Sequence, residues 1–484
     1  MSTASKRILG HDIAPGPCAW PLFDVAHTRA LEAAHPASSG STPLMQRAGL
    51  AVARLALALA PHARVIWLAC GPGNNGGDGL LAAAHLQRWG KQVVASLVHD
   101  PLQRFAEAGA AWQQAQTAGV RFSTQAPAHF DLCIDALFGI GALRALQAPY
   151  AEWVQTMNQS AAPTLAVDLP SGLDADTGAA AALHVRARHT LCLLTLKPGL
   201  FTGLGRDACG DIWFDDLDVT PTDAPQAWLM GSPPARARPH ASHKGSFGDV
   251  AVVGGASGMA GAALLAARSA LHGGAGRVYV CPLDPSAMPL DSAQPELMFR
   301  PLAALDWQTE TLVVGCGGGQ AMADVLPEIL LHAKRLVLDA DALNAIAQNR
   351  LLQNLLAQRA AGSTVITPHP LEAARLLGSS AAQVQAQRLA AAHTLAARFS
   401  ALVVLKGSGT VLAQTGEPTR INPSGNARLA TAGTGDVLAG LIAAYWAAGQ
   451  SAWEAASAAV FQHGMAADQH PGTVLTASRL CQWT

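Results

Sequence analysis

The stretch Val65-Ile-Trp-Leu-Ala-Cys70, followed by Gly71-Pro-Gly-Asn-Asn-Gly-Gly-Asp-Gly79 and an apolar helical run from Leu80, decides the fold of the N-terminal half. The first six residues are apolar without alternation, which is typical of a strand buried on both faces of a parallel sheet. A glycine-rich turn between strand and helix lets backbone N–H groups approach phosphate oxygens, and the helix N-terminus favours their negative charge. The stretch therefore predicts a β/α unit with an anion-binding turn.

Further apolar runs alternate with Ala/Leu-rich helical stretches and form two series. The first series is Val65–Cys70, Gln92–Val98, Asp131–Asp135, Thr164–Val167 and Thr190–Thr195, and the second is Val250–Gly254, Arg277–Cys281, Thr311–Val314, Arg335–Leu338, Thr364–Ile366 and Leu402–Leu405. This pattern predicts an α/β class in which parallel sheets are covered by helices on both faces.

The length of 484 residues predicts two domains, because a single hydrophobic core stops growing well before that size. We expect a tail over residues 1–20, a first domain over 21–222, a linker rich in Pro, Ala and Ser over 223–240, and a second domain over 241–484. The two series share no motif, so we expect a fusion of unlike domains.

Composition excludes several partners. The formal net charge is -1, charged residues make up only 13%, and no basic run is present, which argues against nucleic acid and anionic membranes. The most apolar helical stretch, Ala48–Ala60, is too short to span a bilayer. Eight cysteines are scattered singly, which predicts reduced thiols in a cytoplasmic protein without a zinc site.

Polar residues at the ends of the first-series strands predict a ligand site. Gly71, Gly73 and Gly76 satisfy the Gly-x-Gly-x-x-Gly pattern of NAD dehydrogenases, which is one interpretation. That pattern leaves the paired amides and the carboxylate of Asn74–Asp78 unexplained, and such oxygens suit a bound cation. Asp135 and Asp168 also end strands, where ligands bind in open parallel sheets.

Four blocks of the first domain resemble the NAD(P)H-hydrate epimerase family over about residues 20–218. They are Leu44-Met-Gln-Arg-Ala-Gly49, Gly71–Gly79, Asp135-Ala-Leu-Phe-Gly-Ile-Gly141 and Val167-Asp-Leu-Pro-Ser-Gly-Leu-Asp174. The resemblance implies a Rossmann-like three-layer αβα domain whose K⁺ ligands are Asn75, Asp135 and Ser171. It implies that the hydrated nucleotide contacts Asn74, Asn75, Gly76, Gly77, Asp78, Gly139, Ile140, Gly141, Ala142, Leu143, Arg144, Ala145 and Asp168.

Asp168 is our expected acid/base, because epimerising the hydrate carbon requires only that a hydroxyl leave and water return. No redox step is needed, so a nucleotide-shaped pocket need not belong to a dehydrogenase. The segment Ala142-Leu143-Arg144 departs from the more polar loop that the family would suggest.

The second domain carries its own constellation. Gly433-Thr-Gly-Asp436 at the start of an apolar helix would place backbone N–H groups around an oxyanion while Asp436 takes a hydroxyl proton, which suits phosphoryl transfer. Lys406, with Gly407 and Gly409 at the end of a strand, would meet a nucleotide's phosphates. A P-loop segment is missing.

This domain resembles the ribokinase-like α/β fold and, within it, the ADP- or ATP-dependent NAD(P)H-hydrate dehydratases over about residues 240–484. The matching blocks are Leu338-Asp-Ala-Asp-Ala-Leu-Asn344, Thr367-Pro-His-Pro370, and Asn422-Pro-Ser-Gly-Asn426 followed by Gly433–Asp436. The resemblance implies that Asp436 activates the hydroxyl and that the hydrate contacts Ala262, Gly317, His369 and Asp436. It implies that Lys406, Gly407, Ser408, Gly409, Thr410 and Gly435 hold ADP, with Mg²⁺ bridging the phosphates and with AMP and phosphate as products.

Three positions depart from the dehydratase pattern. Cys316 stands where proline is usual, Leu371 where glycine is usual, and Ala432 where a second glycine is common. We expect reduced or altered activity from these changes.

Together the two halves predict a homo-oligomeric enzyme that returns hydrated NADH and NADPH to their reduced forms. One alternative is a small-molecule kinase of the ribokinase-like fold fused to a nucleotide-binding regulatory domain. Another is that the first domain has lost catalysis, although Asn75, Asp135, Asp168 and Ser171 are all present.

Overall fold

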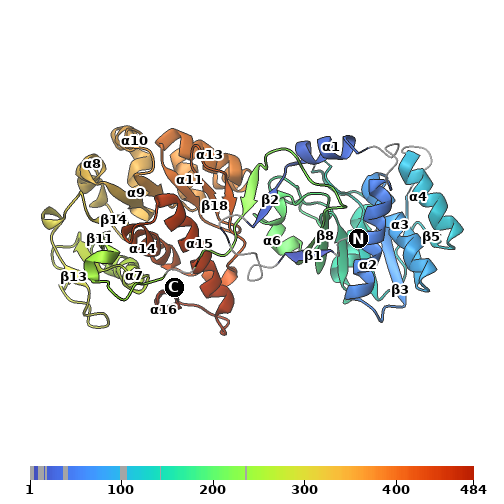
Figure 1. The fold of residues 1–484 in the computed structure, drawn as a ribbon, viewed down its shortest axis with the longest axis horizontal. Helices are drawn as coiled ribbons and strands as arrows, with labels where there is room; N and C mark the ends of the chain where they lie inside the picture. The colour runs from blue at the N-terminus through green and yellow to red at the C-terminus, as the bar shows by residue number, and fades with distance from the viewer. Residues whose placement is uncertain are drawn as a thin grey trace. The chain divides into compact units, whose positions relative to one another are not determined.

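The computed structural model describes residues 5–8, 16, 19–35, 42–98, 106–141, 143–234 and 237–483. The chain divides into two compact units, one of Met1–Asp12 and Pro21–Ala227 and one of Ile13–Trp20 and Trp228–Thr484 (Figure 1). Each unit contains a mostly parallel sheet, which confirms the predicted α/β class. Ala142 and part of the expected tail lie outside the described residues.

The first unit is built on an eight-stranded sheet of order β1-β9-β8-β7-β6-β3-β4-β5, in which only the β1–β9 pair is antiparallel. Its elements are β1 (Lys6–Ile8), α1 (Val25–Ala33), α2 (Leu44–Leu59), β3 (Val65–Cys70), α3 (Asn74–Arg88), β4 (Gln92–Ser96), α4 (Ala106–Thr117), β5 (Arg121–Ser123), β6 (Leu132–Ala136), α5 (Tyr150–Gln159), β7 (Thr164–Val167), β8 (His189–Leu193), α6 (Gly205–Ala208) and β9 (Asp211–Asp215).

Alternate residues of β3 face different helices, which makes this unit three layers. Ile66 and Leu68 pack in a core with buried residues of α2 and α3, whereas Trp67 packs on the other face with Trp153 of α5. Side chains of a strand alternate between the faces of its sheet, so an unbroken apolar strand can serve both cores.

The second unit is built on an eleven-stranded sheet of order β13-β12-β11-β14-β15-β16-β17-β18-β19-β10-β2. Its elements are β2 (Trp20–Leu22), β10 (Ala227–Leu229), β11 (Asp249–Gly254), α7 (Ala260–His272), β12 (Arg277–Pro282), β13 (Met298–Phe299), β14 (Thr311–Val314), α8 (Met322–His332), β15 (Arg335–Leu338), α9 (Ala340–Gln348), α10 (Arg350–Ala357), β16 (Thr364–Ile366), α11 (Pro370–Leu377), α12 (Ala381–Ala386), α13 (Arg388–Phe399), β17 (Leu402–Leu405), β18 (Val411–Ala413), β19 (Arg420–Ile421), α14 (Thr434–Ala447), α15 (Ala452–Gln469) and α16 (Ala477–Trp483).

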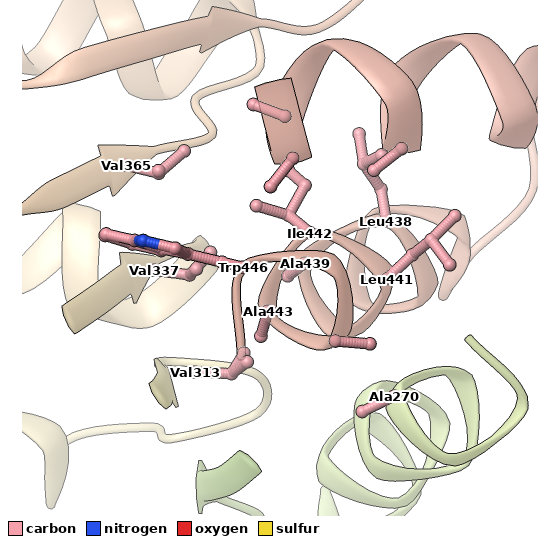
Figure 2. Close-up of a cluster of buried hydrophobic side chains, with 14 of the residues drawn as sticks. Ala270, Val313, Val337, Val365, Leu438, Ala439, Leu441, Ile442, Ala443 and Trp446 are labelled. Carbon is pink, nitrogen blue, oxygen red and sulfur yellow. The ribbon is translucent and has the colours of Figure 1, made fainter. Parts of the chain in front are cut away.

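This sheet also separates two cores. Val313 and Val337 pack with α7, α14 and α15, while Leu312 and Leu336 pack with α8, α9 and α13. Figure 2 shows the first of these cores, where the indole of Trp446 from α14 lies beside Val337 and Val365. Helix α14 is therefore fixed along its length against the sheet.

The structure differs from the sequence expectations in three places. The expected tail contains β1, the interval expected as a linker contains β10, and α3 begins at Asn74 rather than at Leu80. These strands were not predicted because β1 is short and begins with two basic residues, and because the short apolar run of β10 lies within a segment rich in Pro and Ala. The helix start was not predicted because Gly76 and Gly77 are poor helix formers, yet here they lie in its first turn.

Candidate active sites

A cavity of about 750 Å³ opens at the carboxyl ends of β3, β6 and β7 in the first unit. The predicted residues that line it are Asn74, Asn75, Asp78, Gly139, Ile140, Gly141, Arg144 and Asp168. Gly76 and Gly77 are instead buried in the first turn of α3, and Leu143 and Ala145 are exposed outside the lining. Ala142 lies outside the described residues.

The glycine turn after β3 is required by close backbone packing. A Cβ on Gly71 would lie 1.7 Å from the carbonyl oxygen of Leu137, and one on Gly76 would lie 1.9 Å from that of Gly71. Because the turn is this tight, α3 begins beside the cavity, and its first N–H groups have no partner within the helix. Such a helix start can hold a phosphate or another anion.

Asp168 forms a buried ion pair with Lys197, a residue that the sequence analysis did not assign. The Lys197 ammonium donates to an Asp168 oxygen and, at 2.8 Å, to the carbonyl of Leu193. Burial lowers the pKa of Lys197, but the charge and hydrogen bond of Asp168, together with nearby Cys192 and Glu32, outweigh it and the net pKa is raised. Asp168 has a φ of 67°, a backbone conformation that costs about 1–3 kcal/mol outside glycine and is concentrated at functional sites.

Asp78 is a second carboxyl group at this cavity. Burial raises its pKa well above the ordinary value, and the charge of Asp168 raises it further. Burial thus favours the protonated form of Asp78, while Asp168 is ion-paired with Lys197. Two carboxyl groups in such different surroundings can share acid and base roles.

Beside them, Asp135 and Ser171 form a buried oxygen cluster. The Ser171 hydroxyl and backbone N–H donate to the two Asp135 oxygens at 2.7 and 2.8 Å, and the pKa of Asp135 is raised to about 6 by burial. A Cβ on Gly139 would lie 3.4 Å from Asn75 Oδ1, while Asn75 Nδ2 is buried without a hydrogen-bond partner. Asn75 is thus held by packing near this loop rather than by hydrogen bonds.

In the second unit, Asp436 lies in the first turn of α14, above the carboxyl ends of the central strands. Burial raises its pKa to about 6, and the charge of Asp339 adds to that rise. A Cβ on the adjacent Gly435 would lie 3.2 Å from Lys406 Nζ and 3.6 Å from Asp339 Oδ2. The helix start, the lysine and both carboxylates therefore form one site.

Asp339 organises that site. It is 1% exposed and accepts hydrogen bonds from Lys406 Nζ at 2.6 Å and from Thr367 Oγ1 at 2.8 Å. Burial lowers the pKa of Lys406, but the charge and hydrogen bond of Asp339, together with the Glu372 charge and Cys316, outweigh it and the net pKa is raised, so the ammonium stays protonated. A fixed positive charge beside a helix N-terminus is suited to phosphate oxygens.

Cys316 also lies at the site formed by Asp339 and Asp436. Its Sγ, an Asp339 oxygen and an Asp436 oxygen all lie within 4.8 Å of one another. The thiol hydrogen-bonds to the Asp436 carboxylate, which lowers the pKa of Asp436 against the effect of burial. The residue that replaces the family's proline thus contacts the predicted catalytic carboxylate.

The loop that carries Gly407, Ser408 and Gly409 is supported by Arg388. This guanidinium is 1% exposed and donates to the carbonyls of Leu405, Lys406 and Gly409 at 3.1–3.3 Å. Thr410 ends the loop and donates its hydroxyl to the Gly407 carbonyl at 3.3 Å. The predicted nucleotide residues Gly407–Thr410 therefore lie on one loop whose backbone carbonyls are held by Arg388.

The residues predicted to bind the hydrate lie on neighbouring loops. A Cβ on Gly317 would lie 3.0 Å from Ala262 Cβ, so these two are adjacent. His369 caps α11, since its Nδ1 accepts from Leu371 N at 3.1 Å and from Glu372 N at 3.3 Å. Burial lowers the pKa of His369, and the Lys406 charge contributes to that effect. Its ring is thus neutral and oriented near the lysine.

Comparison with known proteins identifies the lineage of both halves. Residues 250–481 match the family described as NAD(P)H-hydrate dehydratase, and residues 41–199 match the family described as YjeF-related protein N-terminus. A bifunctional NAD(P)H-hydrate repair enzyme of Escherichia coli (strain K12) is 37% identical over 449 residues, covering 88% of this chain and 84% of the relative. This chain belongs to the family of bifunctional NAD(P)H-hydrate repair enzymes.

The bifunctional NAD(P)H-hydrate repair enzyme of Leishmania braziliensis is 35% identical over 498 residues, covering 90% of this chain and 88% of the relative. An ADP/ATP-dependent NAD(P)H-hydrate dehydratase from Bacillus subtilis, co-crystallized with ATP/Mg²⁺, is 28% identical over 51% of this chain and 90% of its own, with a TM-score of 0.42. Membership in the repair-enzyme family confirms the predicted pairing of an epimerase with a dehydratase.

Several residues of this repair enzyme were not assigned from the sequence. Lys197, Asp339 and Arg388 are each a single charged side chain beside apolar residues, and each finds its partner in a distant segment. Asp339 lies within Leu338–Asn344, one of the blocks that resemble the dehydratases, and this was the one sequence feature that could have marked it as a site residue. Across the described part of the chain, every helix is too short or too polar to cross a membrane.

Proposed function

We propose that the first unit interconverts the R and S hydrates of NADH and NADPH, with Asp168 as the group that moves the proton. Support comes from the cavity at the strand ends, from the burial that raises the pKa of Asp78, and from the ion pair between Asp168 and Lys197. Protonated Asp78 can assist departure of the hydroxyl, and the Asp168 carboxylate can accept a proton from the returning water. Lys197 pairs with Asp168 and holds its orientation.

Asn75, Asp135 and Ser171 would hold a potassium ion. The donor set fits, since it offers an amide oxygen, a carboxylate and a hydroxyl, and the buried Asp135 carboxylate has no cationic partner among the described residues. A monovalent cation supplies charge that lets Asp135 ionise and fixes the 139–141 loop. Arg29 also holds this loop, through a 2.9 Å hydrogen bond to the Ile140 carbonyl.

The second unit dehydrates the S hydrate with ADP. Asp436 takes the proton of the substrate hydroxyl as its oxygen attacks the β-phosphoryl group, AMP leaves, and elimination of phosphate then restores the reduced ring. Lys406 and the start of α14 neutralise the transferring phosphoryl oxygens, and Gly407–Thr410 hold the nucleotide. Magnesium would supply further charge neutralisation between the phosphates.

One observation carries this proposal: each unit has a carboxylate at its sheet's ligand-binding edge beside a buried lysine, Asp168 with Lys197 and Asp436 near Lys406. The test is to incubate pure R or S NADH hydrate with ADP and follow the absorbance of reduced nicotinamide. The parent should restore both, Asp168→Ala should restore only the S form, and Asp436→Ala should restore neither. Phosphorylation of another small molecule with the hydrate untouched would support the kinase alternative instead.

We further propose a boundary between domains within residues 223–240 and a homo-oligomer acting in the cytoplasm. The division of the chain near Ala227 supports the boundary. Seven described cysteines, all buried and free, support a reducing compartment.

A further inference from the structure

One buried histidine lies behind the dehydratase site and has no part in the chemistry proposed above. His463 of α15 is 8% exposed, and its Nε2 lies 2.9 Å from the carbonyl oxygen of Thr434 in the first turn of α14. A carbonyl oxygen can only accept a hydrogen bond, so Nε2 carries the proton and donates it. The contact therefore fixes both the tautomer of the ring and its orientation.

His463 is neutral in this position. Burial lowers its pKa to about 4, against the opposing effect of the hydrogen bond to Thr434, and the Lys406 charge lowers it further. A neutral imidazole has one N–H group. At neutral pH that single N–H is therefore committed to the Thr434 carbonyl.

The carbonyl that accepts this hydrogen bond belongs to the same peptide unit as the N–H of Gly435. The two groups are joined by one planar C–N bond of partial double-bond character. A donor at the oxygen draws electron density from the nitrogen and strengthens the N–H as a donor, by about 10–30% per bond. A contact made on the α15 side of helix α14 thereby acts on an N–H group at the start of that helix.

The Gly435 N–H lies where a phosphate would be held. The N–H groups of Thr434 and Val437 donate to backbone carbonyls at 3.4 and 3.1 Å. Within the described part of the chain, the N–H groups of Gly435 and Asp436 between them are left for a ligand. A Cβ on Gly435 would lie 3.2 Å from Lys406 Nζ, so this helix start is beside the cation that is suited to phosphate oxygens.

We propose that His463 is a positioning residue of the dehydratase reaction, which strengthens the Gly435 N–H as a donor to a phosphate oxygen of ADP. The proposal rests on the proposed function of the second unit, because it requires a phosphate group at the start of α14. His463 itself touches neither the hydrate nor the nucleotide, and it acts through the peptide unit that joins Thr434 to Gly435. Donors of this kind act on charge that develops in the transition state, so we expect the loss of His463 to lower kcat.

The first test is turnover of S NADH hydrate with ADP. His463→Leu should lower kcat about three- to tenfold, less than the loss of a whole oxyanion donor, and should change KM for the hydrate less than about twofold. His463→Gln places an amide N–H close to the Nε2 position and should keep kcat within about twofold of the parent. Ser269→Ala is the matched control, because the Ser269 hydroxyl donates to the Val437 carbonyl at 2.6 Å and so holds the same helix without acting on Gly435. This control should keep the parental kcat.

A nuclear magnetic resonance measurement tests the same contact without turnover. The dipeptide Thr-Gly occurs four times, at residues 177–178, 202–203, 415–416 and 434–435, so ¹³C-carbonyl threonine with ¹⁵N-glycine selects four amide signals. Donation to the Thr434 oxygen moves the ¹⁵N signal of Gly435 downfield. The signal of His463→Gln should therefore lie downfield of that of His463→Leu, while the other three signals stay in place. Neither variant has the imidazole ring, so a ring current cannot cause the difference.

Three results would each overturn the proposal: equal Gly435 shifts in the glutamine and leucine variants, a parental kcat in His463→Leu, or a loss in Ser269→Ala as large as that in His463→Leu. The three other Thr-Gly signals report whether a variant is folded. His463→Phe keeps a flat ring without a donor and replaces the leucine variant should that one not fold. A parent that leaves the hydrate unchanged would contradict the proposed function, whereas parental turnover with equal Gly435 shifts would contradict the role of His463 alone.

Discussion

Lys406 Nζ lies 2.6 Å from Asp339 Oδ1, and this pair joins the end of β17 to the end of β15, two strands away in the sheet. The pair places a permanent cation beside Gly435 and Asp436. Its geometry is fixed further by Thr367, which donates to the same Asp339 oxygen. Nucleotide binding and proton removal therefore depend on one carboxylate that performs neither.

Asp339→Asn should lower the dehydratase kcat/KM by roughly 100-fold, since it leaves the Lys406 charge unpaired and free to move from the phosphates. Recovery of reduced-nicotinamide absorbance from S hydrate with ADP measures this. R-to-S epimerisation by the same variant should match the parent. If Asp339→Asn kept the parental dehydratase activity, Asp339 would not be needed to position Lys406.

The dehydratase rate should rise with pH through about 6, because Asp436 must be ionised to take a proton and its pKa is raised to about 6 by burial. The kcat/KM profile between pH 5 and 8 would show the acidic limb. Asp436→Asn should abolish the activity at every pH. A flat profile in the parent would mean that another group removes the proton.

Cys316→Ala should move that acidic limb to higher pH, because the thiol hydrogen bond lowers the pKa of Asp436. We expect about threefold lower kcat/KM at pH 5.5 and little change at pH 8, given the modest strength of such a bond. Cys316→Ser keeps a donor and should follow the parent. Cys316→Pro, the family's usual residue, should behave like the alanine variant. If serine and alanine behave alike, the thiol acts only by filling space.

Lys197→Met should slow R-to-S epimerisation roughly 100-fold, because Asp168 loses the ammonium that orients it. Conversion of pure S hydrate should be unaffected. Lys91→Met is the matched control, since Lys91 donates only to the backbone carbonyls of Pro61 and Ala63. Equal epimerase rates in the two variants would contradict the role of Lys197.

Potassium should stabilise the first unit above pH 6. The pKa of Asp135 is raised to about 6 in the folded state. The protonated carboxyl group therefore contributes to the free energy of unfolding below about pH 4, and this contribution is lost as pH rises through 6. Above that pH the carboxylate is available to a cation. Replacing sodium by potassium at pH 7.5 should add about 1–3 kcal/mol, or roughly 2–10 °C in Tm. Asp135→Asn should abolish this response. A parent that responds equally at pH 5 and pH 7.5 would argue against Asp135 as the ligand.

Prediction from sequence succeeded where strands are long and buried. Six apolar runs, Val65–Cys70 and Thr164–Val167 among them, coincide with strands of the structure, because unbroken apolar character reports burial on both faces. Short strands such as β1 and β19 carry mixed residues and leave no pattern. Gly139–Gly141 line the first cavity, whereas Lys197 and Arg388 were not found from the sequence, since their partners depend on tertiary folding.

The order of segments along the chain bears on how this protein can be divided. Strand β2 is the last strand of the second unit's sheet, although it precedes the body of the first unit in sequence. A fragment that starts at residue 228 would therefore leave the backbone of β10 unpaired on one side, and exposed strand edges recruit other chains. A single cut between the two halves would therefore not give two intact domains. To produce the two activities separately, the N-terminal segment has to accompany the second half, either by circular permutation or as an added peptide.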